Sequence, residues 1–205
     1  MSMPVIYPAI IFETSTAHVS NCATLALRLS RKHGDTITLA PQTQAAELVP
    51  SINRLLEKHA ISYSDLACLI TTVGPGTFTG IRIGLAVARM IAFTQPQLQA
   101  LGITTLQAAA MIQPPEIAEL CVALRAGKGD LYMQRFQHSY AVWQATSPIT
   151  LCKPDALPDL PIISEPATAT QIADHLDQLP PDAALPLEPL YIRPPDAKLP
   201  VKPLL

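Results

Sequence analysis

A glycine-rich segment between two apolar runs constrains the fold of this chain more than any other feature. The segment runs from Gly74 to Gly84 and holds four of the eight glycines; it follows the apolar run Leu66–Val73 and leads into a second, Ile81–Phe93. A strand, a glycine-rich turn and a helix in this order commonly bind a phosphate at the helix N-terminus. However, no carboxylate occurs between residues 66 and 115, and no Gly-Lys-Ser or Gly-Lys-Thr follows the glycines. We therefore expect these glycines to serve another purpose.

Two catalytic functions remain as alternatives, one suggested by the glycine segment and one by Glu13. Gly74, Gly76 and Gly80 fit a loose dinucleotide-binding pattern, although the acidic residue expected about 20 positions later is missing and Pro75 lacks a backbone N–H. Glu13 is a candidate metal ligand or general base, but its nearest carboxylate in the sequence is Asp35, which favours a structural or surface role. The alternative function is thus a small kinase or an oxidoreductase that uses the Gly74–Gly80 loop.

The composition predicts a globular protein without a resident cofactor. Hydrophobic residues make up 49% of the 205 residues and charged residues 15%, which suits a chain with a sizeable core. The net charge of −2 and the absence of a basic run argue against a nucleic-acid platform. The four cysteines and five histidines lack metal-ligand spacing, so we expect neither a metal nor a cofactor. The chain shows no signal-peptide pattern and no apolar span of about 20 residues, which predicts a cytoplasmic protein away from membranes.

The hydrophobic pattern predicts an α/β fold in two lobes. In the first lobe we expect strands at residues 6–12, 22–29, 36–39, 66–73 and 99–103, and helices at 44–59, 80–93 and 105–111. Three strands, a helix, a strand and a helix follow the order of a ribonuclease H-like unit. Strands at 118–124, 131–136 and 141–146 repeat the initial meander, which gives lobes at residues 1–106 and 107–205. Thirteen of the 21 prolines lie after residue 147, so we expect extended chain and loops there, with one helix at 169–179.

Small residues form a stripe on the helix after the glycine turn. Gly80, Gly84 and Ala88 are four residues apart and therefore share one face. A glycine inside a helix costs about 1 kcal/mol relative to alanine, so Gly84 requires a packing reason. Two interpretations are open: the stripe packs tightly on the domain's own sheet, or it contacts a helix of another subunit.

The glycine segment also carries a family resemblance. Residues 74–86 resemble the signature GPGSFTGLRIGLA of the TsaB (YeaZ) family. Further similarities lie at Glu13–Thr16 (family IDTST), Leu48–Pro50 (LLP), Gly102–Leu106 (GVSSL) and Pro189–Lys198 (the family C-terminus). The chain departs from the family at Glu13 (Asp in the family), at Gln44 (His) and at Arg125-Ala126-Gly127 (Asp-Ala-Arg). These departures weigh against a catalytic or binding role for those positions.

The resemblance implies a fold and a role. The fold is a pair of ribonuclease H-like lobes in the actin/Hsp70/sugar-kinase arrangement, with a degenerate nucleotide cleft. The role is a scaffold or dimerisation subunit, not itself an enzyme, that is required to form N6-threonylcarbamoyladenosine on tRNA. The expected partners are a TsaD-type catalytic subunit and, transiently, a TsaE-type ATPase. The resemblance leaves open whether the chain alone forms a homodimer, and it implies that tRNA binds only through the complex. The interface is expected on helices of the N-terminal lobe, at Leu48, Ile52, Leu55, Gly80, Ile81, Gly84, Leu85 and Ala88.

Overall fold

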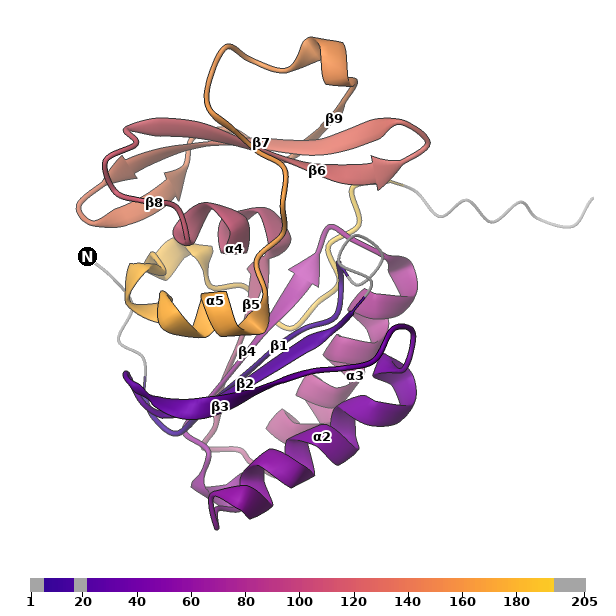
Figure 1. The fold of residues 1–205 in the computed structure, drawn as a ribbon, viewed down its shortest axis with the longest axis vertical. Coiled ribbons are helices and arrows are strands. Elements are labelled where there is room, and N and C mark those ends of the chain that lie inside the picture. Colours follow the sequence, from indigo (N-terminus) through magenta and orange to yellow (C-terminus); the bar gives the residue numbers. More distant parts are fainter. Residues whose placement is uncertain (1–5, 17–21, 194–205) are drawn as a thin grey trace, which may run out of the picture.

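The computed structural model describes residues 6–16 and 22–193 and stacks two sheets and two helix pairs in alternating layers (Figure 1). One five-stranded sheet, sheet A, has helices on both faces, and the other, sheet B, lies beyond one of these helix pairs. Among the described residues, no helix is both long and apolar enough to cross a membrane. The described residues do not include His18. They also do not include Pro194–Lys198, the last part of the segment that resembles the family C-terminus.

Sheet A has the strand order β3-β2-β1-β4-β5. Its strands are β1 (Ala9–Glu13), β2 (Thr24–Ser30), β3 (His33–Thr38), β4 (Cys68–Gly74) and β5 (Gln99–Thr104). The pairs β1–β2 and β2–β3 are antiparallel, whereas β1–β4 and β4–β5 are parallel. Every residue of β1 and β4 is buried, as expected for central strands covered on both faces. The predicted ribonuclease H-like order is therefore confirmed for the first lobe.

Sheet B comprises the strands of the second half of the chain. They are β6 (Glu119–Gly127), β7 (Asp130–Ser139), β8 (Val142–Ala145), β9 (Thr150–Cys152) and β10 (Ile162–Ile163). The order is β10-β6-β7-β8, and β9 also pairs with β7. The sequence predicted extended chain and loops after residue 147 and did not identify β9 and β10 as strands of the sheet. These strands are only three and two residues long, too short for a periodic pattern, and they form through pairing with β7 and β6.

Two helices cover one face of sheet A. They are α2 (Gln44–Lys58) and α3 (Phe78–Thr94), and their inward side chains share a core with the sheet. Helix α3 begins two residues before its predicted start because the Thr77 side chain caps it by accepting a hydrogen bond from the Gly80 amide at 3.2 Å. Pro50 lies inside α2 and is exposed.

The other two helices lie between the sheets (Figure 1). Helix α4 (Thr105–Met111) packs on sheet B through Leu106 and Ala109, and on sheet A through Met111. Helix α5 (Ala169–Asp174) lies on sheet A and is shorter than the predicted 169–179 because a 3₁₀ turn, Leu176–Gln178, follows it.

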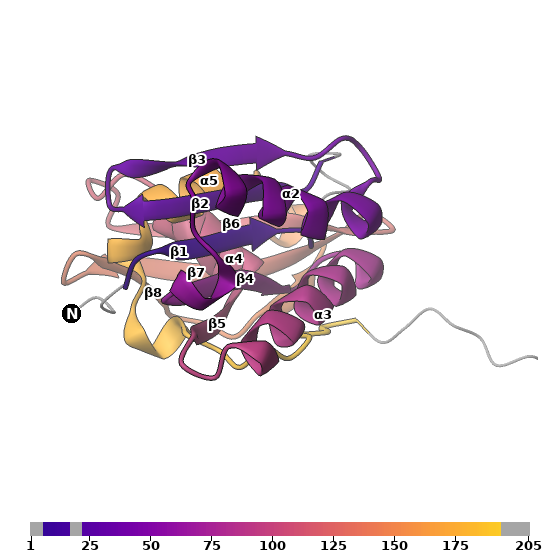
Figure 2. The same cartoon turned by 90° about the horizontal axis from the view of Figure 1, so that it is seen from below.

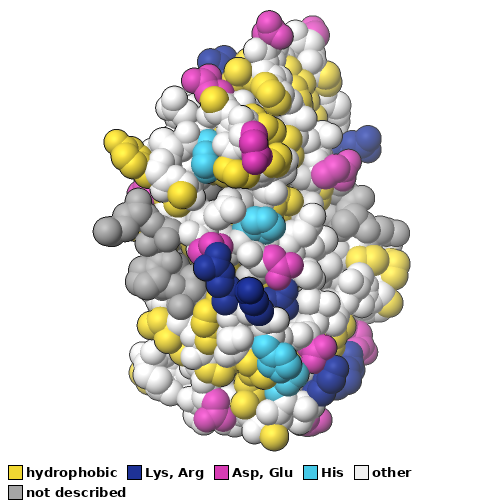
Figure 3. Space-filling view, turned by 60° about the vertical axis from the view of Figure 1, so that its left-hand side comes forward, with side chains coloured by type: hydrophobic (Ala, Val, Ile, Leu, Met, Phe, Trp, Pro, Cys, Tyr) yellow, Lys and Arg dark blue, Asp and Glu magenta, His cyan; other side chains and the backbone are white. Residues whose placement is uncertain are grey.

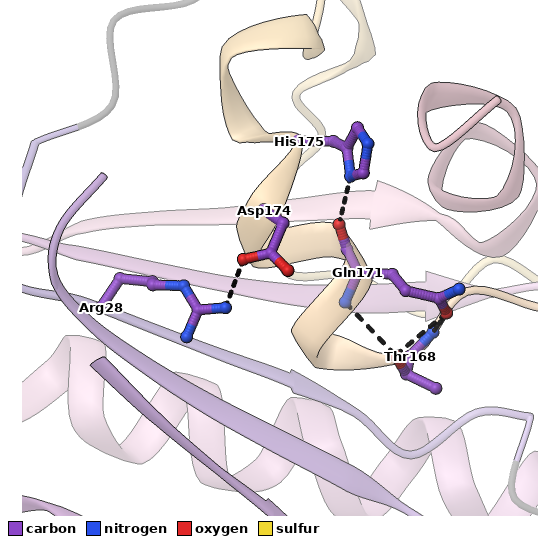
Figure 4. A network of polar contacts seen from close by, with 5 residues as sticks. All are labelled: Arg28, Thr168, Gln171, Asp174 and His175. Atoms are coloured by element: carbon purple, nitrogen blue, oxygen red, sulfur yellow. Dashed lines mark hydrogen bonds and ion pairs between the residues drawn. The ribbon is translucent and has the colours of Figure 1, made fainter. Parts of the chain in front are cut away.

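Polar contacts fix α5 on sheet A (Figure 4). The buried Arg28 of β2 pairs with Asp174, and the Ala169 amide donates to the Thr24 hydroxyl at 2.8 Å. Thr168 and Gln171 cap the helix reciprocally. A segment from the second half of the chain thus completes the core of the first sheet. The predicted division into lobes 1–106 and 107–205 remains a prediction, although sheet A lies within the first range and sheet B within the second.

The chain then returns along α3 as residues 185–193, which we call the C-terminal strap (Figure 2). Leu185 exchanges two backbone hydrogen bonds of 2.8 Å with Gly102 at the edge of β5. The Leu190 amide donates to the Val73 carbonyl at 2.8 Å. Three leucines of the strap pack against Val73, Ile81 and Leu85: Leu185, Leu187 and Leu190. The strap therefore covers the open edge of sheet A and one side of α3.

Candidate functional site

Glu13 stabilises the turn that follows β1. Its carboxylate is buried, with the residue 3% exposed. Oε1 accepts from the amides of Ser15 at 2.8 Å and Thr16 at 3.0 Å, and from the hydroxyls of Ser15 and Thr72 at 2.5 and 3.0 Å. Oε2 accepts from the Thr16 hydroxyl at 2.6 Å. These donors compensate the buried charge. The carboxylate thus has a structural role, which sequence analysis favoured over that of a metal ligand or general base.

The glycine loop packs directly against this turn. The Thr77 amide donates to the Ser15 carbonyl at 2.8 Å, and the Thr14 hydroxyl donates to the Gly80 carbonyl at 2.8 Å. A Cβ added at Gly76 would lie 2.4 Å from the Ser15 carbonyl oxygen, and one at Gly80 would lie 2.1 Å from that of Thr14. The glycines are needed because two stretches of backbone approach closely here.

This geometry argues against a phosphate-binding loop. Such a loop must present free backbone N–H groups to the anion. Here the Thr77 amide is bound to a carbonyl oxygen and the Gly80 amide to the Thr77 hydroxyl. The neighbouring cavity is about 160 Å³ and is lined by Gly76, Thr77, Arg125, Ala126, Gly127 and Tyr132. Ligand pockets usually measure roughly 300–1,000 Å³, so the cavity is small for a nucleotide. The structure therefore gives no support to a dinucleotide-dependent oxidoreductase or a kinase.

No potential metal site is found in the described part of the chain. Residues 6–16 and 22–193 bring no three His, Cys, Asp or Glu side chains together in a metal-binding arrangement. Burial raises the pKa of Cys68 to about 12, which keeps this thiol protonated at neutral pH. The absence of a metal or cofactor remains a prediction.

The small-residue stripe of α3 faces the chain's own sheet. Gly80, Gly84 and Ala88 are buried, and a Cβ added at Gly84 would lie 2.5 Å from Thr14 Oγ1 and 3.4 Å from Thr71 Oγ1. The first of the two interpretations of the stripe therefore describes this structure. Helical spacing identified the residues that share a face, but it could not show that the turn after β1 covers that face.

The other residues predicted for a partner interface are buried as well. Leu48, Ile52 and Leu55 of α2 belong to the core with sheet A, and Ile81 and Leu85 of α3 lie under the C-terminal strap. All eight predicted interface residues are therefore inaccessible at the surface. Their place in a partner interface stays a prediction; a partner that docks on this structure would meet the opposite sides of the two helices.

The opposite side of α3, its outer face, exposes large apolar residues. Phe93 is 87% exposed, Met90 49% and Phe78 44%. The outer face is completed by exposed residues of other kinds: Arg82, Ala86 and Arg89. α3 has no acidic residue. The sequence interpretation missed this face because it followed the small residues alone.

The N-terminal end of the outer face is ordered by the C-terminal strap. The Tyr191 ring stacks on Phe78 with centroids 5.4 Å apart. The Arg82 guanidinium lies 3.7 Å from the centroid of the Phe78 ring, and Arg82 Nε donates to the Tyr191 hydroxyl at 3.2 Å. The attraction between the Arg82 cation and the face of the Phe78 ring stabilises this position of the arginine side chain. A different side of the molecule, shown in Figure 3, carries a small group of basic side chains with acidic side chains beside it.

Comparison with known proteins gives a family match and several relatives. Residues 38–184 match the family model described as TsaD: tRNA N6-adenosine threonylcarbamoyltransferase. The tRNA threonylcarbamoyladenosine biosynthesis protein TsaB of Escherichia coli (strain K12) is 26% identical over 120 residues, which are 57% of this chain and 52% of that protein. The protein of the same name from Bacillus subtilis (strain 168) is 28% identical over 74 residues, which are 35% and 32% of the two chains. The chain thus spans about half or less of the length of these relatives.

Two solved structures share the fold. One is described as an uncharacterized protein with similarity to peptidase YEAZ from Pseudomonas aeruginosa, and the other as YeaZ from the same organism. Both superpose with a TM-score of 0.70 at 17% identity; they cover 90% and 89% of this chain, and 99% and 98% of their own. Together with the family match, the likeness confirms the predicted α/β fold class of the ribonuclease H-like, actin/Hsp70/sugar-kinase type.

Proposed function

We infer the function of this chain from its family: it belongs to the family of tRNA N6-adenosine threonylcarbamoyltransferases described by the TsaD model, and within it to the TsaB (YeaZ) type. We propose that it is a scaffold subunit required to form N6-threonylcarbamoyladenosine on tRNA. In this role it pairs with a TsaD-type catalytic subunit. tRNA is bound by the complex and not by this chain alone.

The observation that carries the proposal is the exposed outer face of α3. A phenylalanine that is 87% exposed lies on the same helix face as Phe78 and Met90. Large exposed apolar residues that gather on one face mark an interaction surface, and aromatic and arginine side chains dominate binding energy in such surfaces. Helix α2 packs beside α3 on the same face of sheet A. The TsaD-type subunit therefore docks on α3 and the adjoining side of α2.

Three features support a non-catalytic role. The Glu13 carboxylate is committed to the turn after β1, the glycine loop is closed by the Ser15 carbonyl, and the cavity beside it is small. The opposing possibility is transferase activity in this chain itself, since the matching family model is that of the transferase. Catalysis resides instead in the TsaD-type partner. A TsaE-type ATPase joins the pair transiently.

Phe93→Asp tests the docking surface. A carboxylate in place of this ring should weaken binding to a purified TsaD-type subunit of the same organism by about a hundredfold, because removal of a central aromatic anchor typically costs about 2–4 kcal/mol. Isothermal titration calorimetry measures the affinity, and threonylcarbamoyl transfer to tRNA by the mixture measures activity. The matched control is Tyr140→Asp, since Tyr140 is an equally exposed aromatic (86%) in the β7–β8 turn.

Each outcome of this experiment is informative. Loss of binding and of transfer by the Phe93 variant, but not by the control, supports the proposal. Undiminished binding by the Phe93 variant would refute the docking surface. Transfer to tRNA, or steady ATP hydrolysis, by the chain alone would refute the non-catalytic role.

A further inference from the structure

Two arginines on the outer face of α3 are each held by the C-terminal strap. Arg82 Nε donates to the Tyr191 hydroxyl at 3.2 Å, and Arg89 Nε donates to the Leu187 carbonyl at 2.7 Å. Arg82 is also stacked on the Phe78 ring. In both side chains the inner nitrogen of the guanidinium is thus bound to the protein. This contact fixes the plane of the group and lowers the conformational entropy that binding would remove.

The terminal nitrogens of both arginines have no acceptor within the described residues. Neither Arg82 nor Arg89 forms an ion pair there, in contrast to Arg28, Arg31, Arg54 and Arg193. Both are exposed, and α3 itself contains no Asp or Glu. Each arginine therefore presents two ordered nitrogens to the outside. Such a planar fork matches the two oxygens of a carboxylate.

We propose that Arg82 and Arg89 are a pair of carboxylate receptors, oriented by the strap, that recognise an acidic and apolar helix of the partner. The inference rests on the proposed docking at α3. The two arginines are seven residues apart, which is about 10 Å along a helix. The partner helix should carry two carboxylates at about this spacing, flanked by apolar side chains that cover Phe78, Met90 and Phe93.

Charge and spacing favour such a partner over a second copy of this chain. Two α3 helices brought face to face would place arginines against arginines. The acidic residues of α2, Glu47 and Glu57, are ten residues apart, about 15 Å along the helix, and Glu47 already pairs with Arg54. A second copy thus offers no matching pair of carboxylates on these helices.

The surroundings also favour a protein over RNA. Binding to a nucleic acid backbone relies on several neighbouring cations. On this face the neighbours of the two arginines are Phe78, Ala86, Met90 and Phe93, and the net charge of the chain is −2. An apolar surface with two fixed cations suits the apolar stripe of a helix with acidic residues along it.

The experiment compares charge-preserving with charge-removing variants in binding to the purified TsaD-type subunit. Arg82→Lys and Arg89→Lys keep the charge but lose the planar fork, and each should weaken binding by about tenfold. The double variant Arg82→Gln/Arg89→Gln should weaken it by about a hundredfold or more and should abolish the salt dependence of the wild-type affinity. Arg135→Lys, an exposed arginine on β7, is the control and should bind as the wild type does.

A double-mutant cycle tests the role of the strap. Tyr191→Phe removes the hydroxyl that holds Arg82 but keeps the ring on Phe78, and it should weaken binding about threefold. In the Arg82→Lys background the same change should have no further effect, because the oriented fork is already lost. Thermal melts of all variants should match the wild type, which separates recognition from folding.

Other outcomes would overturn the inference. If the double glutamine variant binds as tightly as the wild type while Phe93→Asp does not bind, the docking surface stands and the receptors are refuted. If both variants bind normally, the proposed docking fails as well. If the double variant instead loses filter-binding affinity for isolated tRNA, with the partner affinity unchanged, the two arginines recognise phosphate and not a protein helix.

Discussion

The two faces of α3 have different residues and different neighbours. The inner face presents Gly80, Gly84 and Ala88 to the turn after β1 and to β4, and it leaves no room for a larger side chain. The outer face presents large apolar residues and two arginines to solvent. Both faces are unusual for a surface helix, whose outer side is normally polar. A stripe of small residues thus marks a close contact, but not the molecule that makes it.

The largest effect should follow from Gly84→Leu on the inner face. A Cβ alone would lie 2.5 Å from Thr14 Oγ1, so a leucine must displace the helix from the sheet. Overpacking of this kind costs about 3 kcal/mol, which lowers the melting temperature by roughly 6–12 °C for a chain of this size. Differential scanning calorimetry measures the shift.

Ala86→Leu is the matched control for this prediction. Ala86 is exposed on the same helix two residues further on, and its replacement should change stability by no more than about 0.5 kcal/mol. A Gly84→Leu variant that melts like the wild type would show that the stripe does not pack on the chain's own sheet. That result would restore the other interpretation, a contact with another subunit.

A smaller loss of stability should follow from Glu13→Ala, which removes the carboxylate that holds the turn after β1 against the inner face of α3. The amides of Ser15 and Thr16 and the hydroxyl of Thr72 would lose their buried acceptor. Unsatisfied buried donors cost about 1–3 kcal/mol, and we expect about 2 kcal/mol from urea unfolding. Glu57→Ala, at an exposed position of α2, should cost less than about 0.5 kcal/mol. If the two variants were equally stable, the hydrogen bonds of Glu13 would contribute nothing net.

The sequence contains enough information for the order of the elements. Apolar runs and helical spacing predicted the five strands of sheet A and the three helices α2, α3 and α4, because these elements are long or strongly periodic. The missing carboxylates predicted that the glycines serve another purpose, and in the structure the Thr77 and Gly80 amides are bound to acceptors within the protein. Local pattern is sufficient where a segment's neighbours along the chain determine its conformation.

The two faces of α3 could not be predicted from local pattern, because they depend on contacts between residues that are distant in sequence. Gly80 is buried because of Thr14, 66 positions away, and Arg82 is oriented by Tyr191, 109 positions away. The prolines after residue 147 predicted extended chain correctly, but not that it would lie along β5 and α3. Spacing within one helix does not reveal which of its sides these distant segments cover.

The smallest effect on stability should come from removing an ion pair at the C-terminal end of α2, away from both faces of α3. Asp35 of β3 lies 2.9 Å from Lys58 Nζ and 2.6 Å from His59 Nε2 at the end of α2. Hydrogen bonds from Lys58 and then from His59 hold the pKa of Asp35 below its ordinary value of 3.8. A lowered carboxyl pKa stabilises the fold above pH 3.8, and this stabilisation is lost as the pH falls through the folded-state pKa.

Asp35→Asn should therefore lower the melting temperature slightly at pH 7. The difference from the wild type should shrink as the pH is lowered below 3.8, where the wild-type carboxyl takes up its proton. It should also shrink in 0.5 M salt, since exposed pairs are screened by ions. Melting curves over pH and salt give both comparisons. A loss as large as that of Gly84→Leu, or a difference independent of pH, would mean that Asp35 contributes through packing and not through charge. The contrast between the tightly packed inner face of α3 and the ion pair of Asp35, where packing is expected to matter little, would then need revision.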